Sequence, residues 1–277
     1  MPVIAMTQEM GSLAKDVAVQ LATSLGLAVM RHEVVAHVAD RMQVPTSLIG
    51  RLRSGKAGLL ERLTTDERSV ALYTAEELFQ LASADNVVLR GWGATCLLRP
   101  VTHIPCIRVT RSLAKRVEWL MGHLETDDAA FAEAEVRRSD NAHASRMGQQ
   151  FGVTWGDPGL YDLVLNTDRV SVESCVAQIA QLVSRPEFAA TAESRALLAD
   201  MALQARVRVA LKEHAATQAI DVTITSTHAE VQLSGIVVHA DERQAAGEVA
   251  AGVAGVARVD NQLRVMSRSR LFTSAKY

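Results

Sequence analysis

The residues best suited to chemistry follow the first apolar run of the sequence. Residues 3–6 (VIAM) indicate a short buried strand, and the loop TQEMGSLAK follows at residues 7–15. Gly11, Ser12, Lys15 and Asp16 belong to this loop and the helix start after it. Backbone N–H groups and the dipole at the start of a helix favour an anion, and a lysine adds positive charge. The stretch is therefore a candidate phosphate-binding site.

The loop departs from the standard phosphate-binding pattern, G-x-x-x-x-G-K-[ST]. Counted back from Lys15, the two glycine positions hold Glu9 and Ala14, and Asp16 stands where serine or threonine is expected. The pattern alone therefore indicates an ordinary helix start with an exposed lysine, and the phosphate site depends on its wider context.

The elements that would position this loop alternate along the first two thirds of the chain. Such alternation predicts an α/β fold with three layers, in which helices cover both faces of a mostly parallel sheet. Sheets of this kind bind ligands at the carboxyl ends of their strands, here after Met6, Met30 and Leu89. We expect strands at 3–6, 27–30, 87–89, 104–109 and 160–165, and helices at 17–25, from 34 onward, and at 69–82, 112–148 and 171–183.

One segment of this region does not fit the alternation. Residues 45–58 are polar and basic, with Arg51, Arg53 and Lys56 between glycines. We expect a mobile loop whose cations either contact phosphate or remain in solvent.

The last third of the chain has a different pattern. After a boundary at residues 189–195, a helix is expected at 196–214, two one-sided strands around 222–224 and 231–233, a helix capped by Asp241 and ended by Gly255, and a strand at 259–265. A turn is expected at 226–228, and Gly235 would let the second strand turn away. The order αββαβ predicts a small α+β module over 196–267, after a first domain at 1–188. Residues 268–277 are expected to form a loose tail.

The composition excludes several classes of protein. Apolar residues make up 48% of the chain and the net charge is −2, which excludes a disordered chain and gives no basic field for nucleic acid. We expect a cytoplasmic protein, because the sequence shows neither a signal peptide nor a spanning apolar segment. No metal site is expected, since the three cysteines and eight histidines form no ligand pattern, and the cysteines should be free thiols.

Residues 3–185 resemble the cytidylate kinase-like family of bacterial P-loop proteins. The loop TQEMGSLAK aligns with the family's Ser-Arg-Glu-aromatic-Gly-Ser-Gly-Gly-Arg loop, and NVVLRGWGA (86–94) with a strand followed by Gly-Arg-Gly-Ala. CIRV (106–109), with Arg111 and Arg116 after it, is similar to the family's next strand and arginine-bearing helix. The best match is GVTWGDPGLYDLVLNT at 152–167.

The resemblance implies transfer of the γ-phosphoryl group of ATP to a nucleoside monophosphate such as CMP, with ATP and Mg²⁺ as cofactors. Its catalytic cations would be Lys15 and two lid arginines, Arg137 and Arg138. Gly11, Ser12, Lys15 and Asp16 would bind the phosphates of the cofactor. The substrate would be held by Arg31, Arg90, Trp92, Arg108 and Arg111.

Other positions depart from the family. Leu13 and Ala14 replace loop glycines and would crowd a phosphate, Arg31 replaces a carboxylate, and Trp92 and His143 stand where arginines are common. Losing one oriented charge can cost about 10³-fold in the rate of phosphoryl transfer. We therefore expect a nucleotide-binding sensor or scaffold with a degenerate phosphate loop. The alternative is an active nucleoside monophosphate kinase.

Two tryptophans allow either of two roles. Trp92 and Trp155 have aromatic faces that suit stacking on a base. For Trp155, packing in the core or lid is the favoured reading.

Residues 196–267 resemble a BON domain through VQLSG (231–235) and GVARVDNQL (255–263). The resemblance implies that this module binds a ligand or a protein partner rather than catalysing a reaction. A role at a membrane surface is the second alternative, although the module has no basic amphipathic face. Exposed strand edges also lead us to expect a homo-oligomer.

Overall fold

The structure is a computed structural model that describes residues 2–30, 32–54, 56–91 and 93–266 of the chain. The chain divides into two compact units, Met1–Arg195 and Ala196–Tyr277, and each is described here by itself. Helix α10 (Ala192–Glu213) begins inside the segment that the sequence suggested as a linker.

The first unit contains a five-stranded parallel sheet in the order β2-β3-β1-β4-β5. Its strands are β1 (Val3–Gln8), β2 (Ala28–Met30), β3 (Val87–Arg90), β4 (Cys106–Thr110) and β5 (Leu163–Asn166). Its helices are α1 (Ala14–Leu25), α2 (His32–Arg41), α3 (Thr46–Ser54), α4 (Leu59–Thr64), α5 (Glu67–Ser83), α6 (Ala94–Leu97), α7 (Leu113–Leu124), α8 (Ala129–Phe151) and α9 (Val172–Val183), with 3₁₀ turns at Pro158–Leu160 and Pro186–Phe188.

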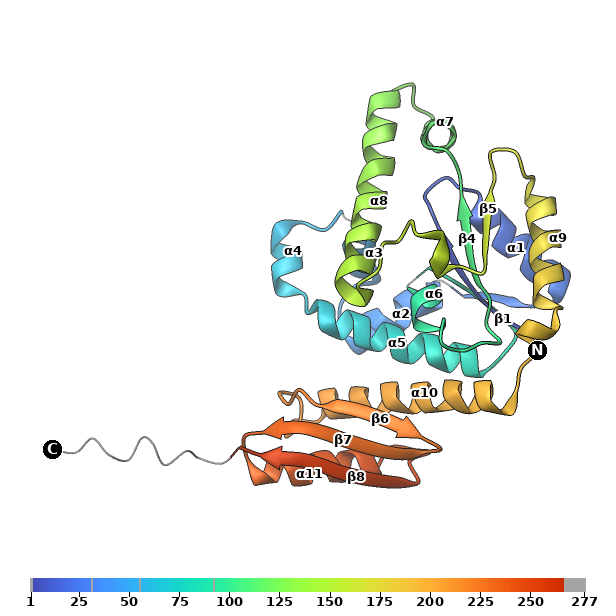
Figure 1. The fold of residues 1–277 in the computed structure, drawn as a ribbon. Helices are drawn as coiled ribbons and strands as arrows, with labels where there is room; N and C mark the ends of the chain where they lie inside the picture. Colours follow the sequence, from blue (N-terminus) through green and yellow to red (C-terminus); the bar gives the residue numbers. More distant parts are fainter. Residues whose placement is uncertain (1, 31, 55, 92, 267–277) are drawn as a thin grey trace. The chain divides into compact units, whose positions relative to one another are not determined.

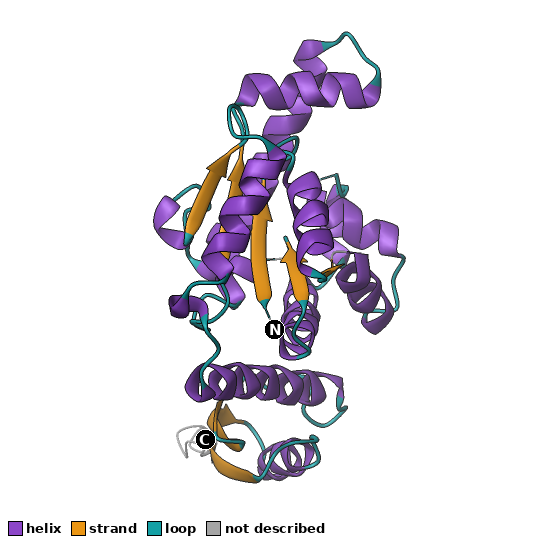
Figure 2. Ribbon diagram, turned by 90° about the vertical axis from the view of Figure 1, so that its right-hand side faces the viewer, coloured by secondary structure: helices purple, strands orange, loops and turns teal. Residues whose placement is uncertain are grey.

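Helices cover both faces of this sheet (Figures 1 and 2). Successive side chains of a strand point to opposite faces, and Val3, Ile4, Ala5 and Met6 are all buried. Ile4 and Met6 pack with residues of α1 and α9 in one core cluster. The predicted α/β fold with a parallel sheet is therefore confirmed.

The register of the sheet brings the strand ends together. Met6 pairs with Arg90 on one side and with Ile107 on the other, and Thr110 of β4 pairs with Asn166 of β5. The residues that follow β1, β4 and β5 therefore meet at one edge of the sheet.

The expectation of a mobile loop at residues 45–58 is wrong. Helix α3 occupies most of this segment, because Ile49 is fully buried and anchors it. Arg51 Nη2 lies 2.5 Å from Glu61 Oε1, and Lys56 Nζ lies 2.9 Å from Glu135 Oε2. The polar composition of the segment concealed this apolar anchor.

The second unit has the predicted αββαβ order. Its sheet has the order β6-β7-β8, with β6 and β7 antiparallel and β7 and β8 parallel. Leu203 and Val207 of α10, Leu233 of β7 and Ala246 of α11 share one core cluster. After α10 the elements are β6 (Thr223–Thr227), β7 (Glu230–Val237), α11 (Ala240–Ala251) and β8 (Arg258–Val265).

Four local expectations for this unit are wrong. The turn lies at His228 and Ala229, both with positive φ, because β6 extends to Thr227. The N-cap of α11 is His239 rather than Asp241, and its C-cap is Gly252 rather than Gly255. Strand β7 continues past Gly235 to Val237, paired with β8 throughout. Several residues that could cap a helix or form a turn occur close together in this sequence, so composition alone did not locate the ends of β6, β7 and α11.

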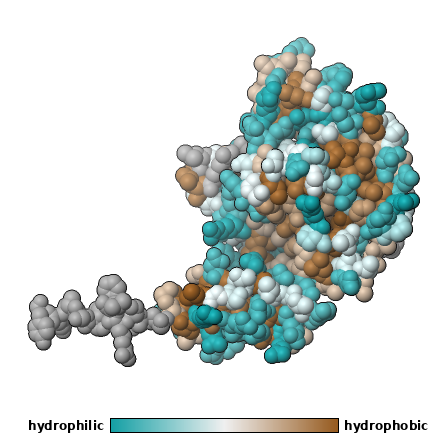
Figure 3. Space-filling view, viewed as in Figure 1, coloured by the Kyte–Doolittle hydropathy of each residue, from teal (hydrophilic) through white to brown (hydrophobic). Residues whose placement is uncertain are grey.

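The surfaces of the two units include exposed apolar groups among hydrophilic ones (Figure 3). In the second unit, Ile236, Val238, Val265 and Met266 are exposed at the ends of β7 and β8. No helix of the described residues is both long enough and apolar enough to cross a membrane.

Candidate functional site

The backbone of the loop after β1 is left-handed at two positions, and only one of them is a glycine. Gly11 has φ 77°, and Leu13 has φ 61°, a left-handed conformation that disfavours a branched side chain. A Cβ atom at Gly11 would lie 3.1 Å from Arg116 O and from a ring carbon of Trp119, so only glycine fits between the loop and α7. The methyl group of Ala14 is buried in the core cluster, and it does not crowd the loop as the sequence suggested.

Glu9 lies at the centre of the sheet edge. Its Oε1 accepts a hydrogen bond from Arg108 Nη2 at 2.6 Å, and its Oε2 accepts one from Thr110 Oγ1 at 2.7 Å and one from the N–H of Arg111 at 3.2 Å. Arg116 Nε lies 3.6 Å from the same Oε2. The side chains of Glu9, Arg108 and Arg116 are each about nine-tenths buried. Burying an unpaired charge is costly, so each of these charges is stabilised by its oppositely charged neighbour.

Aromatic residues hold Arg108 in place. Its guanidinium carbon lies 4.4 Å from the centre of the Trp155 ring and 5.5 Å from that of Tyr161. Its Nη1 donates to Trp155 O at 2.8 Å, and Trp155 Nε1 donates to Thr7 Oγ1 at 3.1 Å. Burial of Trp155 agrees with the packing role predicted for it, and the His143 ring lies 4.3 Å from its own.

The other arginines of this edge also face carboxylates. Arg116 donates to both carboxylate oxygens of Asp140, at 2.9 and 2.8 Å. Arg111 Nε lies 3.9 Å from Asp168 Oδ1, and Asp168 also accepts from the N–H and hydroxyl of Ser112. Acidic side chains of the chain itself therefore neutralise the cations that β4 and α7 bring to the site.

The structure brings some predicted site residues together and separates others. Arg108 and Arg111 reach the loop through Glu9, and Arg90 Nη1 donates to Gln8 Oε1 at 3.2 Å. Arg137 and Arg138 lie on the exposed side of α8, next to Glu133 and Glu135, and line a cavity to which residues 9–16 do not contribute. Arg31 and Trp92 lie outside the described residues.

Sequence reasoning missed several members of this network. Glu9 was counted as a misplaced loop residue, and Thr110 and Asp168 were not considered. One signal was available: Glu9 directly follows a buried strand, while Arg108 and Arg111 lie on and just after its neighbour. A carboxylate and cations at adjacent strand ends are placed to form ion pairs.

The cysteines are not candidate nucleophiles. All three are free thiols, and Cys106 and Cys175 are buried. Burial raises the pKa of Cys106 to about 12, which keeps it protonated near neutral pH.

Comparison with protein families assigns both units. Residues 3–169 match the model of the cytidylate kinase-like family, which is more than half of the chain. The chain belongs to the cytidylate kinase-like family. Residues 199–267 match the BON domain, which agrees with the module predicted at 196–267.

One solved structure supports the fold of the first unit, and a second is similar over a comparable length. An uncharacterized protein from Eubacterium ventriosum superposes with a TM-score of 0.53 at 17% identity, over 67% of this chain and 100% of its own. A shikimate kinase from Bacteroides thetaiotaomicron gives a TM-score of 0.44 at 14% identity, over 66% of this chain and 99% of its own. No curated protein matches the chain.

Two residues of the loop region, Lys15 and Ser12, take no part in the ion pairs described above. Lys15 is exposed in the first turn of α1. Ser12 is 1% exposed, and its hydroxyl has no hydrogen-bond partner among the described residues. The described residues contain no cluster of three or more His, Cys, Asp or Glu that could hold a metal ion. Mg²⁺ that arrives with a nucleotide needs no such cluster, because phosphates and water supply most of its ligands.

Proposed function

We propose that the kinase-like unit is a nucleotide-binding sensor or scaffold that transfers phosphate poorly or not at all. The observation behind this proposal is the pairing of Arg108, Arg111 and Arg116 with Glu9, Asp168 and Asp140. Phosphoryl transfer depends on cations that stabilise charge on the moving group. Arginines that already neutralise internal carboxylates supply little of that charge.

Binding of a nucleotide needs fewer groups than catalysis. Lys15 is exposed beside the loop, Ser12 has an unsatisfied hydroxyl, and the backbone at Gly11 and Leu13 keeps a left-handed shape. The exposed Lys15 and the loop backbone favour contact with the phosphates of ATP, with Mg²⁺ bound through the nucleotide.

Calorimetric titration of the full chain with ATP and Mg²⁺ tests the binding half of the proposal. We expect saturable binding that the Lys15→Ala variant weakens by about tenfold or more, since a charge-assisted contact is worth about 1.5–3 kcal/mol. An exposed lysine outside the site, Lys115, provides the matched control Lys115→Ala. Titrations that show no binding to the wild-type chain would exclude a nucleotide sensor.

A coupled assay of ATP consumption with CMP, dCMP and other monophosphates tests the catalytic half. We expect turnover at or near background. Sustained turnover that Lys15→Ala removes would instead establish the alternative, an active nucleoside monophosphate kinase.

The loop itself offers a gain-of-function test between the two alternatives. Leu13 has a positive φ, which glycine adopts freely, so Leu13→Gly should fit without rearrangement. We expect this variant to bind ATP more tightly while turnover stays near background, because the arginines remain paired. A large rise in turnover would show that the loop, rather than the arginine pairing, limits catalysis.

For the BON unit we propose that it binds a partner, and that a second copy of the chain is that partner, in the cytoplasm. Strand β8 is an edge of the sheet, and Ile236, Val238 and Met266 are exposed where β7 and β8 end. Sedimentation of the wild-type chain should show a dimer, and Ile236→Asp should dissociate it. The control Thr225→Asp, at an exposed position of β6, should leave the dimer intact. A monomeric wild-type chain at tens of micromolar would rule out this partner.

A further inference from the structure

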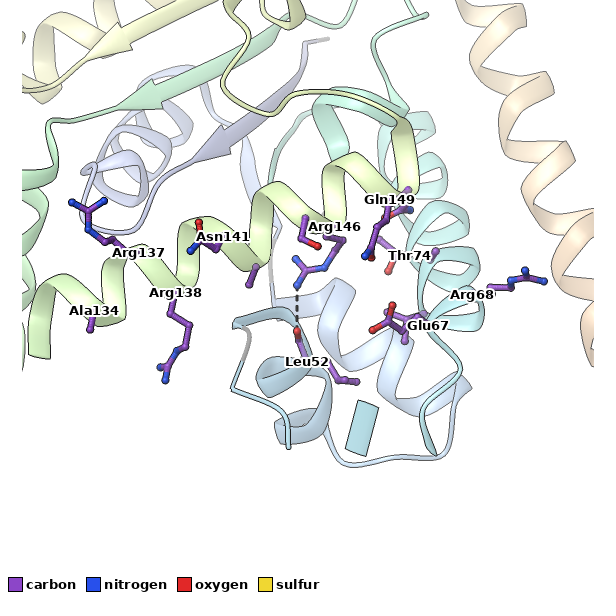
Figure 4. Close-up of a pocket in the computed structure, with 15 residues that line it drawn as sticks. Leu52, Glu67, Arg68, Thr74, Ala134, Arg137, Arg138, Asn141, Arg146 and Gln149 are labelled. Carbon is purple, nitrogen blue, oxygen red and sulfur yellow. Dashed lines mark hydrogen bonds between the residues drawn. The ribbon is translucent and has the colours of Figure 1, made fainter. Parts of the chain in front are cut away.

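A large cavity lies between α5 and α8, beside the end of α3 (Figure 4). Its volume is about 800 Å³, within the range of 300–1,000 Å³ that is usual for small-molecule sites. Among the described residues, Glu67 is the single acidic residue that lines it, and the lining arginines are Arg68, Arg137, Arg138 and Arg146.

The cavity lies on a different side of α8 from the edge of the sheet. With 3.6 residues per turn, Val136, Asp140 and Met147 fall on one face of the helix, and Ala134, Arg138 and Ser145 fall on the opposite one. The first face is buried or paired with Arg116, and the second lines the cavity. A ligand in the cavity would therefore not contact the Glu9 network through these residues.

A buried hydroxyl at the cavity lacks a partner. Thr74 lines the cavity and is 2% exposed, and its Oγ1 has no hydrogen-bond partner among the described residues. An unsatisfied buried polar atom costs about 1–3 kcal/mol, so such atoms usually have a partner, a water or a ligand.

Charge near the cavity is positive on balance. Glu133 pairs with Arg137 and offsets its charge, but Glu135 is shared between Arg138 and Lys56, so one positive charge remains there. Among the described lining residues, Arg68 and Arg146 also outnumber Glu67. Arg146 is held in place by a 3.2 Å hydrogen bond to Leu52 O. Burial lowers the pKa of Arg146, with nearby Glu67 opposing the shift, so an anion close to its guanidinium would be stabilising.

We propose that this cavity is a second binding site, for a small organic molecule that carries a phosphate group. Arginine guanidinium groups match phosphate oxygens with paired N–H donors. Asn141, Ser145 and Gln149 add neutral donors on α8, and Val70 and Ala71 of α5 form an apolar wall suited to the rest of the molecule. The proposal does not depend on nucleotide binding at the phosphate loop.

Calorimetry in a Lys15→Ala background tests the cavity, because that substitution weakens the loop site. The probes are pyrophosphate and a nucleoside diphosphate at constant ionic strength, which separates free phosphate from a phosphate attached to an organic group. We expect saturable binding, tighter for the nucleoside diphosphate, that Arg138→Gln weakens about tenfold and Ser145→Trp abolishes. Ala144→Trp is the matched control, since Ala144 is exposed on the same helix and does not line the cavity.

The outcomes separate the two sites. Binding that survives Lys15→Ala and is lost in Ser145→Trp supports the cavity even if ATP never binds the loop. Equal loss in Ser145→Trp and Ala144→Trp, or no binding once Lys15 is replaced, overturns the proposal and leaves the loop site untouched. Circular dichroism melts of each variant should match those of the parent chain, because Arg138, Ala144 and Ser145 are all exposed.

Discussion

Each unit has a carboxylate that receives several hydrogen bonds, and the two carboxylates have different surroundings. Glu9 in the kinase-like unit faces two buried guanidinium groups, Arg108 and Arg116. Asp200 in the BON unit faces neutral donors: Ser226 Oγ at 2.8 Å, the N–H of His228 at 2.9 Å and the N–H of Ala229 at 3.1 Å. The first holds charges together inside the unit, and the second holds the turn between β6 and β7.

The difference between these surroundings determines whether another anion could take the place of each carboxylate. A ligand anion could replace Glu9, because the arginines around it attract any negative group of similar size. Asp200 accepts instead from a hydroxyl and two backbone N–H groups, and these donors fix a turn that contains two left-handed residues. The Glu9 carboxylate thus lies among cations at the sheet edge, whereas the Asp200 carboxylate holds a turn.

Replacing Glu9 should have the largest effect on stability. Glu9→Ala leaves Arg108 and Arg116 buried without this partner, so the free energy of unfolding should fall by about 3–5 kcal/mol. Tryptophan fluorescence during urea unfolding measures it, because Trp92, Trp119 and Trp155 all precede residue 196. Glu9→Gln, which keeps an acceptor for Thr110, should lose less. A loss below about 1 kcal/mol in Glu9→Ala would show that the arginines are stable without the carboxylate.

Replacing Asp200 should have a smaller effect, confined to the BON unit. Asp200→Ala removes hydrogen bonds to one charged acceptor, which predicts a loss of about 1–3 kcal/mol. The hydrogen bond from the N–H of His228 lies at the surface, where water can replace the carboxylate. Amide NMR signals of β7 through a urea titration measure the loss. A loss as large as that of Glu9→Ala would contradict the contrast between the two sites.

Lowering the pH should reveal the same stabilising role of Asp200 in the BON unit. Burial alone would raise its pKa, but the hydrogen bonds from Ala229, Ser226 and His228 lower it below the usual value. The stability due to Asp200 is therefore complete above the unfolded-state pKa of about 3.9, and it is lost as the pH falls through the lower folded-state pKa. The urea midpoint of β7 signals should fall over this range in the wild-type chain and fall less in Asp200→Asn.

Much of the fold could be predicted because it depends on apolar periodicity. The runs at β1, β3 and β4 are buried on both faces of the sheet, so they form continuous apolar segments that a sequence reveals. Helix α3 was missed because, among its described residues, Ile49 alone is fully buried and the segment is otherwise rich in polar residues. The turn at His228 and Ala229 was predicted too early, at 226–228, because its left-handed backbone carries no glycine or asparagine signal.

The site was less predictable because ion pairs join distant segments. Arg108 and Arg111 were identified as site residues, but their partners Glu9 and Asp168 lie far away in the sequence. The side of α8 that Arg137 and Arg138 occupy follows from helix packing, which the arginine pattern does not specify. A sequence thus identifies charged groups more readily than it identifies which of them neutralise one another.

The smallest expected effect concerns the turn that Asp200 holds. Ala229 has φ 65°, a conformation that costs a non-glycine residue about 1–2 kcal/mol, whereas glycine adopts it freely but loses more entropy on folding. Ala229→Gly should therefore stabilise the BON unit by about 0.5 kcal/mol, measured through the same β7 signals. The matched control, Ala199→Gly on the exposed side of α10, should destabilise it by about 1 kcal/mol. If both substitutions destabilise equally, the hydrogen bonds to Asp200 do not hold Ala229 in a strained conformation, and the turn contributes less to the BON unit than its geometry indicates.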